Sequence, residues 1–200
     1  MRIRSYATPE HDAKRRYDII SIMTNILTVA SDGSCLKNPG GEIGWAWADD
    51  KGRWMANGSP SGTNQSAELM GLASIFMAFP KSHLLVQLDS QYTLNIADKW
   101  MHGWAKAGWT RKGNEPLKNL EFVKVIYALS EARRESGLKT DFQWVKGHGK
   151  NGFYELNDRA DIQCGLSARR VRAGENAYLD SSGNLDSPRQ TKLLKAVGFA

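Results

Sequence analysis

The order of apolar and polar residues along the chain predicts five strands and five helical segments. Short runs of β-branched and apolar residues bounded by turn residues are typical of strands, whereas apolar positions spaced by three and four are typical of helices. We expect Asn64 to cap the first helix and Pro116 to open a later one. The predicted strands are 26–30, 43–48, 53–56, 84–88 and 142–145, and the predicted helices are 64–79, a pair ending near 105, one from 116, and 155–170.

This order predicts an α/β fold with a mixed five-stranded sheet and helices on both faces. The first three strands are close together in sequence, and the Gly-containing turn 49–52 joins two of them as a hairpin. The later strands are separated by helices, as parallel strands are. The nearly all-apolar run 84–88 is typical of a strand that is covered on both faces.

The chain has 200 residues, of which 41% are hydrophobic, and this suits one domain with its own core. We expect a core domain at 25–170, an N-terminal extension at 1–24 and a loosely held tail at 171–200. Two cysteines exclude a disulfide-stapled scaffold and a Cys-rich zinc module. The longest apolar stretch, 19–30, is too short and too polar to span a bilayer, and no cleavage site follows it. We therefore expect a cytoplasmic monomer that does not bind membranes.

Positive charge is concentrated in one segment. The chain carries 27 Lys and Arg against 21 Asp and Glu, a net charge of +6, and the segment 99–118 alone contributes five cations and one acid. Cations interleaved with tryptophans are typical of nucleic-acid surfaces, although the same pattern also fits a solvated helix with its tryptophans in the core. The residues are Lys99, Lys106, Arg111, Lys112 and Lys118, with Glu115, Trp100, Trp104 and Trp109.

Four acids stand at the ends of predicted elements or on helices beside them. Asp32 ends the first strand, Glu68 lies near the start of the first helix, Asp89 ends the fourth strand, and Asp161 is on the last helix. Taken singly, each has a structural explanation: a turn, a favourable helix dipole, an N-cap and a solvated helix face, respectively. Together, carboxylates without cysteine predict a site for Mg²⁺ or Mn²⁺. Strands one and four, if parallel neighbours, place Asp32 beside Asp89.

The residues around these acids resemble type 1 ribonuclease H in ordered blocks that cover about residues 25–170. This resemblance implies the ribonuclease H-like fold, in which strands one to three are antiparallel and strands one, four and five are parallel. The matching blocks are Asp32-Gly33-Ser34-Cys35 with Asn38-Pro39-Gly40, Thr63-Asn64-Gln65 with Ala67-Glu68, Leu88-Asp89-Ser90-Gln91-Tyr92, Trp100-Met101-His102-Gly103-Trp104 with Gly108-Trp109, Pro116-Leu117-Lys118-Asn119, Trp144-Val145-Lys146-Gly147-His148, and Asn157-Asp158-Arg159-Ala160-Asp161.

The resemblance implies hydrolysis of the RNA strand of RNA–DNA hybrids, with two divalent ions and with 5′-phosphate and 3′-hydroxyl products. It implies that Asp32, Glu68, Asp89 and Asp161 hold the ions, which would be Mg²⁺, with Mn²⁺ as a substitute. Asp161 is preferred to Asp158 because it closes the Asn-x-x-x-Asp string that begins at Asn157. His148 matches a mobile-loop histidine that assists proton transfer or product release.

The resemblance also implies the contacts with a hybrid. Amides would read 2′-hydroxyls, a pocket would hold a DNA phosphate, an aromatic surface would lie under the DNA sugars, and the basic segment 99–118 would be a substrate handle, with Trp100 in the core. These roles fall on Asn38, Asn64, Gln65 and Gln91; on Thr63 and Asn119; on Tyr92 and Trp104; and on Lys106, Trp109, Arg111 and Lys112, respectively.

Two other functions fit the sequence. A non-catalytic module that binds hybrids would keep the basic handle, but it would not need all four acids. Another nuclease on the same fold, such as a junction resolvase, would keep the acids but would need neither the amides nor the handle. Cleavage of matched duplexes separates the three hypotheses.

Overall fold

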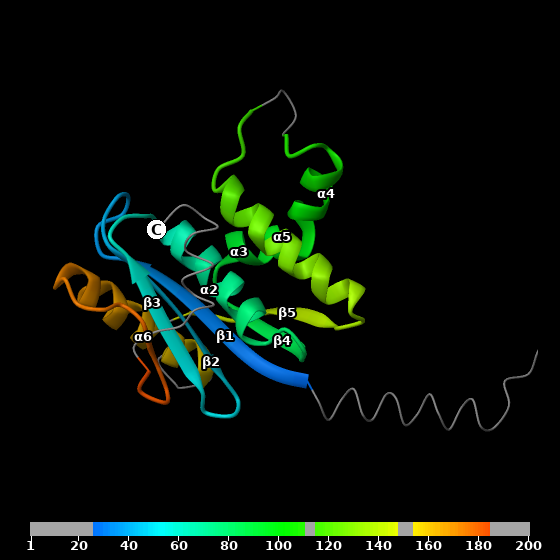
Figure 1. Ribbon diagram of the computed structural model, residues 1–200. Coiled ribbons are helices and arrows are strands. Elements are labelled where there is room, and N and C mark those ends of the chain that lie inside the picture. Colours follow the sequence, from blue (N-terminus) through cyan, green and yellow to red (C-terminus); the bar gives the residue numbers. More distant parts are fainter. Residues whose placement is uncertain (1–25, 111–114, 148–153, 185–200) are drawn as a thin grey trace, which may run out of the picture.

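The computed structural model describes residues 26–110, 115–147 and 154–184, which form a mixed sheet flanked by helices (Figure 1). The sheet has six strands in the order β5-β4-β1-β2-β3-β6. The α/β class with a mixed sheet is confirmed, and the additional strand is the short β6. The strands are β1 (Ile26–Cys35), β2 (Ile43–Asp49), β3 (Trp54–Ser59), β4 (His83–Leu88), β5 (Thr140–Trp144) and β6 (Leu179–Asp180).

Strand β1 lies at the centre and sets the direction of its neighbours. It pairs antiparallel with β2 and parallel with β4, while β5 pairs parallel with β4. The expected pairing of the five strands is therefore observed. Leu88, the last residue of β4, lies opposite Ser31 of β1, so the residues that follow both are neighbours at this point of the sheet.

Helices cover both faces of the sheet. α2 packs on β1 and β2, with α5 against its outer side, whereas α6 packs on β1, β2 and β3 from the other face (Figure 1). All seven residues of β2 are buried, but in β4 only Leu84, Val86 and Leu88 are. The expectation that β4 is covered on both faces is wrong, because α6 lies over the other half of the sheet. The helices are α2 (Asn64–Ala78), α3 (Gln91–Asn95), η1 (Ile96–Trp100), α4 (Met101–Lys106), α5 (Leu120–Glu135) and α6 (Glu155–Arg172).

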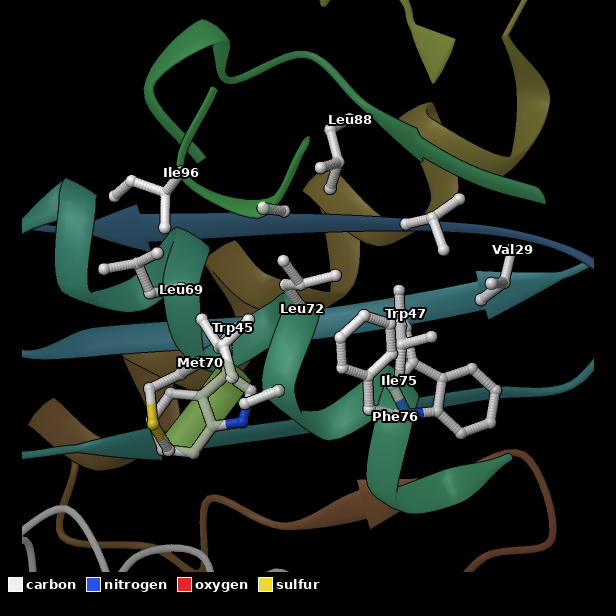
Figure 2. Packing of buried hydrophobic residues seen from close by; sticks show 14 of the residues in the cluster. Val29, Trp45, Trp47, Leu69, Met70, Leu72, Ile75, Phe76, Leu88 and Ile96 are labelled. Atoms are coloured by element: carbon white, nitrogen blue, oxygen red, sulfur yellow. The ribbon is translucent and has the colours of Figure 1, made fainter. Parts of the chain in front are cut away.

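The main core fills the layer between the sheet and α2. Trp45, Met70, Leu72 and Phe76 are fully buried in it, and they interdigitate across this layer in Figure 2. Trp47 adds an edge-to-face contact with Phe79 at 4.8 Å between ring centroids. Burial of such large side chains stabilises the fold by about 2 kcal/mol each, so this layer holds α2 rigidly on β1 and β2.

The N-cap of α2 and the start of α5 differ from the predicted ones by one and four residues, respectively. Thr63, not Asn64, caps α2: its hydroxyl accepts from Ser66 N at 3.0 Å, and Ser66 Oγ accepts from Thr63 N at 2.8 Å. This reciprocal pair satisfies two backbone donors at once, which Asn64 would not do. α5 begins at Leu120 rather than at Pro116, because Asn119 has a left-handed backbone with φ of 57°.

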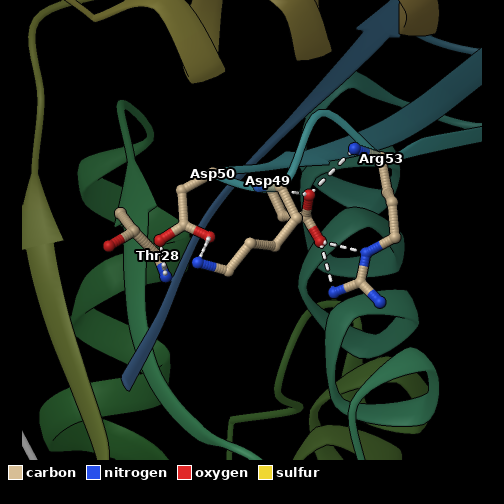
Figure 3. A network of polar contacts seen from close by, with 5 residues as sticks. Thr28, Asp49, Asp50 and Arg53 are labelled. Atoms are coloured by element: carbon tan, nitrogen blue, oxygen red, sulfur yellow. Dashed lines mark hydrogen bonds and ion pairs between the residues drawn. The ribbon is translucent and has the colours of Figure 1, made fainter. Parts of the chain in front are cut away.

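The β2–β3 hairpin is closed by a charged side-chain network (Figure 3). Asp49 Oδ1 accepts from Arg53 N at 2.9 Å, and its Oδ2 accepts from Arg53 Nε at 2.7 Å. Asp50 Oδ2 accepts from Thr28 N at 3.2 Å, which ties the turn to β1. Asp49 is fully buried, so these bonds compensate the burial of its charge. The hairpin is therefore fixed at its 49–53 turn.

Residues 173–184, which fall in the predicted tail, are attached to the sheet. Leu179 and Asp180 pair antiparallel with Ala56 and Met55 of β3. Asp180 then closes a turn by accepting from Ser182 N at 2.9 Å and from Asn184 N at 3.2 Å. α6 ends at Arg172, just beyond the expected residue 170. Within the described ranges, no helix has the length and apolarity needed to cross a membrane.

We expect Arg133→Ala to destabilise the protein by roughly 2–4 kcal/mol. Arg133 of α5 is 4% exposed and donates to Phe79 O at 2.6 Å and Ser82 O at 2.7 Å, so its loss leaves two carbonyl acceptors without this partner. Urea unfolding measures the change. Arg134→Ala is the matched control, because Arg134 is exposed and pairs only with a residue of its own helix, Glu131, among its described ion pairs. Equal effects of the two substitutions would contradict the assignment.

Candidate active site

Two of the four acids come from adjacent parallel strands. Asp32 lies inside β1, which continues to Cys35, so the expectation that Asp32 ends the strand is wrong. Asp89 follows Leu88 at the end of β4. Because Ser31 lies opposite Leu88, the residues that follow, Asp32 and Asp89, are neighbours, as the parallel arrangement predicts.

The other two acids approach from the two helical layers. Glu68 is in the second turn of α2, and Asp161 is in the middle of α6. Gly33 allows the first approach, since a Cβ there would overlap the backbone of Ala67 and Glu68. Gly44 of β2 allows the approach of α6, which carries Asp161.

A Cβ at Gly44 would overlap the backbone of Cys164 and Ala168 on α6. Two glycines therefore let α2 and α6 lie close enough to the sheet for their acids to reach Asp32.

The ligand atoms of these residues converge on Asp32. Oxygens of Asp32, Glu68 and Asp89 all lie within 4.8 Å of one another, and so do ligand atoms of Asp32, Asp161 and Cys164. Asp32 is 5% exposed, whereas the other three acids are half-buried. Cys164 was not among the predicted site residues. The sequence feature that could have identified it is its position three residues after Asp161, which places both residues on one face of α6.

The site has an excess of negative charge among the described groups. Burial, followed by the charge of Asp89, raises the pKa of Asp32 to about 7, although a hydrogen bond from Gly33 N at 2.6 Å opposes the rise. Burial, followed by the charges of Asp32 and Asp89, also raises the pKa of Glu68. No hydrogen-bond donor among the described residues faces the buried Oε2 of Glu68. A divalent cation would neutralise this cluster, so the carboxylates fit a metal site.

Above about pH 4, the stability of the metal-free protein should fall until about pH 7. Because the pKa of Asp32 rises from 3.8 to about 7, the folded state holds a proton in this window that the unfolded state has released. The stabilisation that Asp32 contributes is therefore fully present below about pH 4. It is lost, by roughly 2–4 kcal/mol, as the pH rises through about 7. Urea unfolding in a chelator across this range measures it. Asp32→Asn should flatten the profile, and an unchanged slope in that variant would contradict the assignment.

The segment after β5 lies against Asp89. Trp144, at the end of β5, donates from Nε1 to Asp89 O at 3.0 Å, and a Cβ at Gly147 would overlap the Asp89 carboxylate. Trp144 was not predicted as a site residue, because nothing in the sequence indicates this hydrogen bond. Its ring is half-exposed in the structure. His148, the predicted mobile-loop histidine, lies outside the described residues, as do Arg111 and Lys112.

The predicted amide readers lie on exposed turns near the start of α2 and α3. Asn38 is exposed, and its Oδ1 accepts from Asn64 N at 3.2 Å, so the 38–41 turn lies beside the start of α2. Gln65 and Gln91 are exposed in the first turns of α2 and α3. Thr63 is held in the N-cap of α2. All four amide residues are therefore exposed to solvent.

The predicted aromatic residues form a chain along the handle. The ring centroids of Tyr92 and Trp100 are 6.4 Å apart, and those of Trp100 and Trp104 are 5.8 Å apart. Asn119 Nδ2 donates to the Tyr92 hydroxyl at 3.0 Å. Trp100 is 41% exposed, so its expected place in the core is wrong.

Trp100 ends the π-helical turn η1, in which Ile96 and Ala97 take the buried positions. Lys106, at the end of α4, is exposed. Trp109 follows with a left-handed backbone, φ of 64°, and packs edge-to-face on Tyr127 at 5.3 Å. The handle thus joins the domain through aromatic contacts with α5 and presents Trp100 and Lys106 outward.

Solved structures show the class to which this fold belongs. LC9-RNase H1, described as a type 1 RNase H with the type 2 active-site motif, superposes with a TM-score of 0.60 at 23% identity over 88% of this chain and 86% of that one. The RNase H domain called PFV superposes with a TM-score of 0.55 at 22% identity over 72% of this chain and 94% of that one. The fold is that of ribonuclease H.

Sequence comparison gives the family. The family model RNase H matches residues 24–168. A ribonuclease H of Tropheryma whipplei (strain Twist) is 32% identical over 84% of this chain and 96% of its own length, and one of Xanthomonas campestris pv. campestris (strain 8004) is 32% identical over 74% and 95%. The chain belongs to the ribonuclease H family, and the predicted family and enzyme class are confirmed.

Proposed function

We propose that the protein hydrolyses the RNA strand of RNA–DNA hybrids and leaves 5′-phosphate and 3′-hydroxyl ends. Asp32, Glu68, Asp89 and Asp161 would hold two Mg²⁺ ions, for which Mn²⁺ can substitute. The observation that carries the proposal is the convergence of these buried and half-buried carboxylates on Asp32. Asp32 belongs to both groups of ligand atoms, which suits a carboxylate shared between two cations.

The residues of the chain have distinct tasks in this reaction. When bound, the two ions supply an activated water and stabilise the departing 3′-oxygen. The Gly33 N–H orients Asp32 through its hydrogen bond to Oδ1. Trp144 holds the backbone of Asp89 through its indole N–H. His148 would move a proton or assist release of the product, as its near-neutral pKa range allows.

The exposed residues around the carboxylates would recognise the hybrid. Amides both donate and accept, so they suit a 2′-hydroxyl that is present on only one strand. We assign residues 25–170 to the catalytic domain, with a basic handle at about 99–118, and we expect it to act as a cytoplasmic monomer. The proposed contacts are Asn38, Asn64, Gln65 and Gln91 with 2′-hydroxyls, Thr63 and Asn119 with a DNA phosphate, Tyr92 and Trp104 with DNA sugars, and Lys106, Trp109, Arg111 and Lys112 on the handle.

Cleavage of matched RNA–DNA, RNA–RNA and DNA–DNA duplexes in Mg²⁺ or Mn²⁺ tests the proposal. We expect cleavage of the RNA strand of the hybrid alone, with ends that a 5′-phosphate-dependent exonuclease accepts. Equal cleavage of the other duplexes would favour a different nuclease on this fold. Tight binding without cleavage would favour a non-catalytic module.

Neutralising the handle should weaken binding rather than chemistry. The triple variant Lys106→Gln, Arg111→Gln, Lys112→Gln should lower hybrid affinity and reduce the slope of log affinity against log salt by up to about one for each lost phosphate contact. Titration of a labelled hybrid at several salt concentrations measures the slope. Lys51→Gln is the control, because Lys51 is exposed on the β2–β3 turn. A slope equal to that of the unmodified protein would contradict the role of the handle.

A further inference from the structure

We propose that Cys164, together with Asp32 and Asp161, captures a soft divalent cation of the zinc class beside the carboxylate centre. Such an ion would occupy two of the carboxylates that Mg²⁺ needs and would inhibit the enzyme. The inhibition rests on the proposed function, whereas binding of the ion does not. The chemistry of this site differs from that of the other acids because it includes sulfur.

The geometry brings three ligand atoms of two kinds together. The Cys164 thiol and oxygens of Asp32 and Asp161 lie within 4.8 Å of one another. A tetrahedral zinc ion at about 2.3 Å from sulfur and about 2.1 Å from oxygen needs these atoms roughly 3.6 Å apart. Binding therefore requires the two carboxylates to turn toward the thiol and the ion. Asp161 and Cys164 are one turn apart on α6, and Asp32 faces them from β1.

Buried oxygens near this group point to a bound cation as well. Oε2 of Glu68 is buried and meets no hydrogen-bond donor among the described residues. Burial, followed by the charges of Asp32, Asp161 and Glu68, raises the pKa of the Cys164 thiol, which places this excess of negative charge beside the sulfur. Asn157, 2% exposed and one turn before Asp161, has an Oδ1 that is likewise buried and without a described partner. Buried oxygens without donors are costly unless they meet a proton or a cation.

The preference of each cation for hard or soft ligands decides which one binds more tightly when the thiol is a ligand. Mg²⁺ prefers oxygen ligands and a strict octahedron, whereas zinc and cadmium bind thiolate strongly. Cys164 is fully buried, whereas Asp161 and Glu68 are half-buried, so the carboxylates form the more accessible side of this group. On binding, the thiol proton leaves to solvent, and its hydrogen bond to Asp161 O, now 3.1 Å long, is lost.

Titration with Cd²⁺ alone tests the binding. The chain has two cysteines, so Cys35→Ser leaves Cys164 as the single thiol. We expect this variant to show an ultraviolet thiolate-to-cadmium absorption band that saturates at one equivalent. The band should disappear in Cys35→Ser with Cys164→Ala. No band in Cys35→Ser, or a band that persists without Cys164, would overturn the proposal. Cys164→Ser, with the fold checked by circular dichroism and urea unfolding, keeps the test valid if the alanine variant does not fold.

Cleavage assays separate this inference from the proposed function. In Mg²⁺, added Zn²⁺ should inhibit the Cys35→Ser protein, and Cys164→Ala should raise the half-inhibiting concentration at least about tenfold. Inhibition at the same concentration in both would overturn the regulatory role. If the hybrid is not cleaved at all, the proposed function fails while the cadmium result stands on its own.

Discussion

Replacing Asp32 with Asn should reduce hybrid cleavage at least about a thousandfold, which corresponds to roughly 4 kcal/mol of transition-state stabilisation. Asp32 belongs to both groups of converging ligand atoms, so the substitution removes a negative ligand from each. Hybrid binding should persist, because the amides and the handle lie outside the buried centre. Single-turnover cleavage with excess enzyme measures the chemistry, and filter binding in Ca²⁺ measures the affinity.

Asp158→Asn is the matched control for this substitution. Asp158 is also half-buried on α6, three residues before Asp161, but it is not part of either group of converging ligand atoms. We expect its cleavage rate to stay within about threefold of the original, a change of less than 1 kcal/mol. Robust cleavage by Asp32→Asn, or equal losses in both variants, would refute the assignment of the metal centre.

Gly44→Ala should damage the site from a distance. Its Cβ would overlap backbone atoms of Cys164 and Ala168, which cannot rotate away as a side chain would, so α6 must move from the sheet. We expect a loss of roughly 2–4 kcal/mol in the free energy of unfolding and a weaker metal affinity, because Asp161 moves with α6. Urea unfolding and calorimetric titration with Mn²⁺ measure the two effects.

Gly103→Ala provides the control for Gly44→Ala. Gly103 is exposed in α4, and an added Cβ there meets nothing within 4 Å. The same one-carbon change should therefore leave stability equal or slightly higher, by up to about 1 kcal/mol, through helix propensity. If Gly44→Ala behaves like this control, close packing of α6 on β2 does not position Asp161.

The sequence contained enough information for the sheet and for the neighbouring acids. The crossover between β1 and β4 predicts a parallel pair, and the parallel pair places Asp32 beside Asp89. The exact strand end was not predictable, since Asp32-Gly33 has the composition of a turn while the backbone continues as strand. Gly33 is small because α2 lies against it, and this contact is made by residues more than thirty positions away.

Other features depend on local backbone geometry, which the spacing of apolar residues in the sequence does not indicate. The π-helical turn η1 inserts an extra residue and shifts the side chains that follow it, and Trp100 is exposed where the resemblance implied a core position. Two residues are too few to give a strand pattern, so β6 was not predicted. In the sequence Cys164 is typical of a small core residue, and only the packing of α6 on the sheet shows that it lies beside Asp32.

The acids of the centre come from distant parts of the chain, and this has a consequence for folding. Asp32 and Asp161 are 129 positions apart, and they meet only where α6 is docked on the sheet. Bringing together residues so far apart in sequence closes a long loop, which carries an entropic cost and is associated with slow folding. If Asp161 is a metal ligand, as we propose, a chain in which α6 is not docked lacks one of the four carboxylates. The proposed hydrolytic centre is therefore complete only when α6 lies on the sheet.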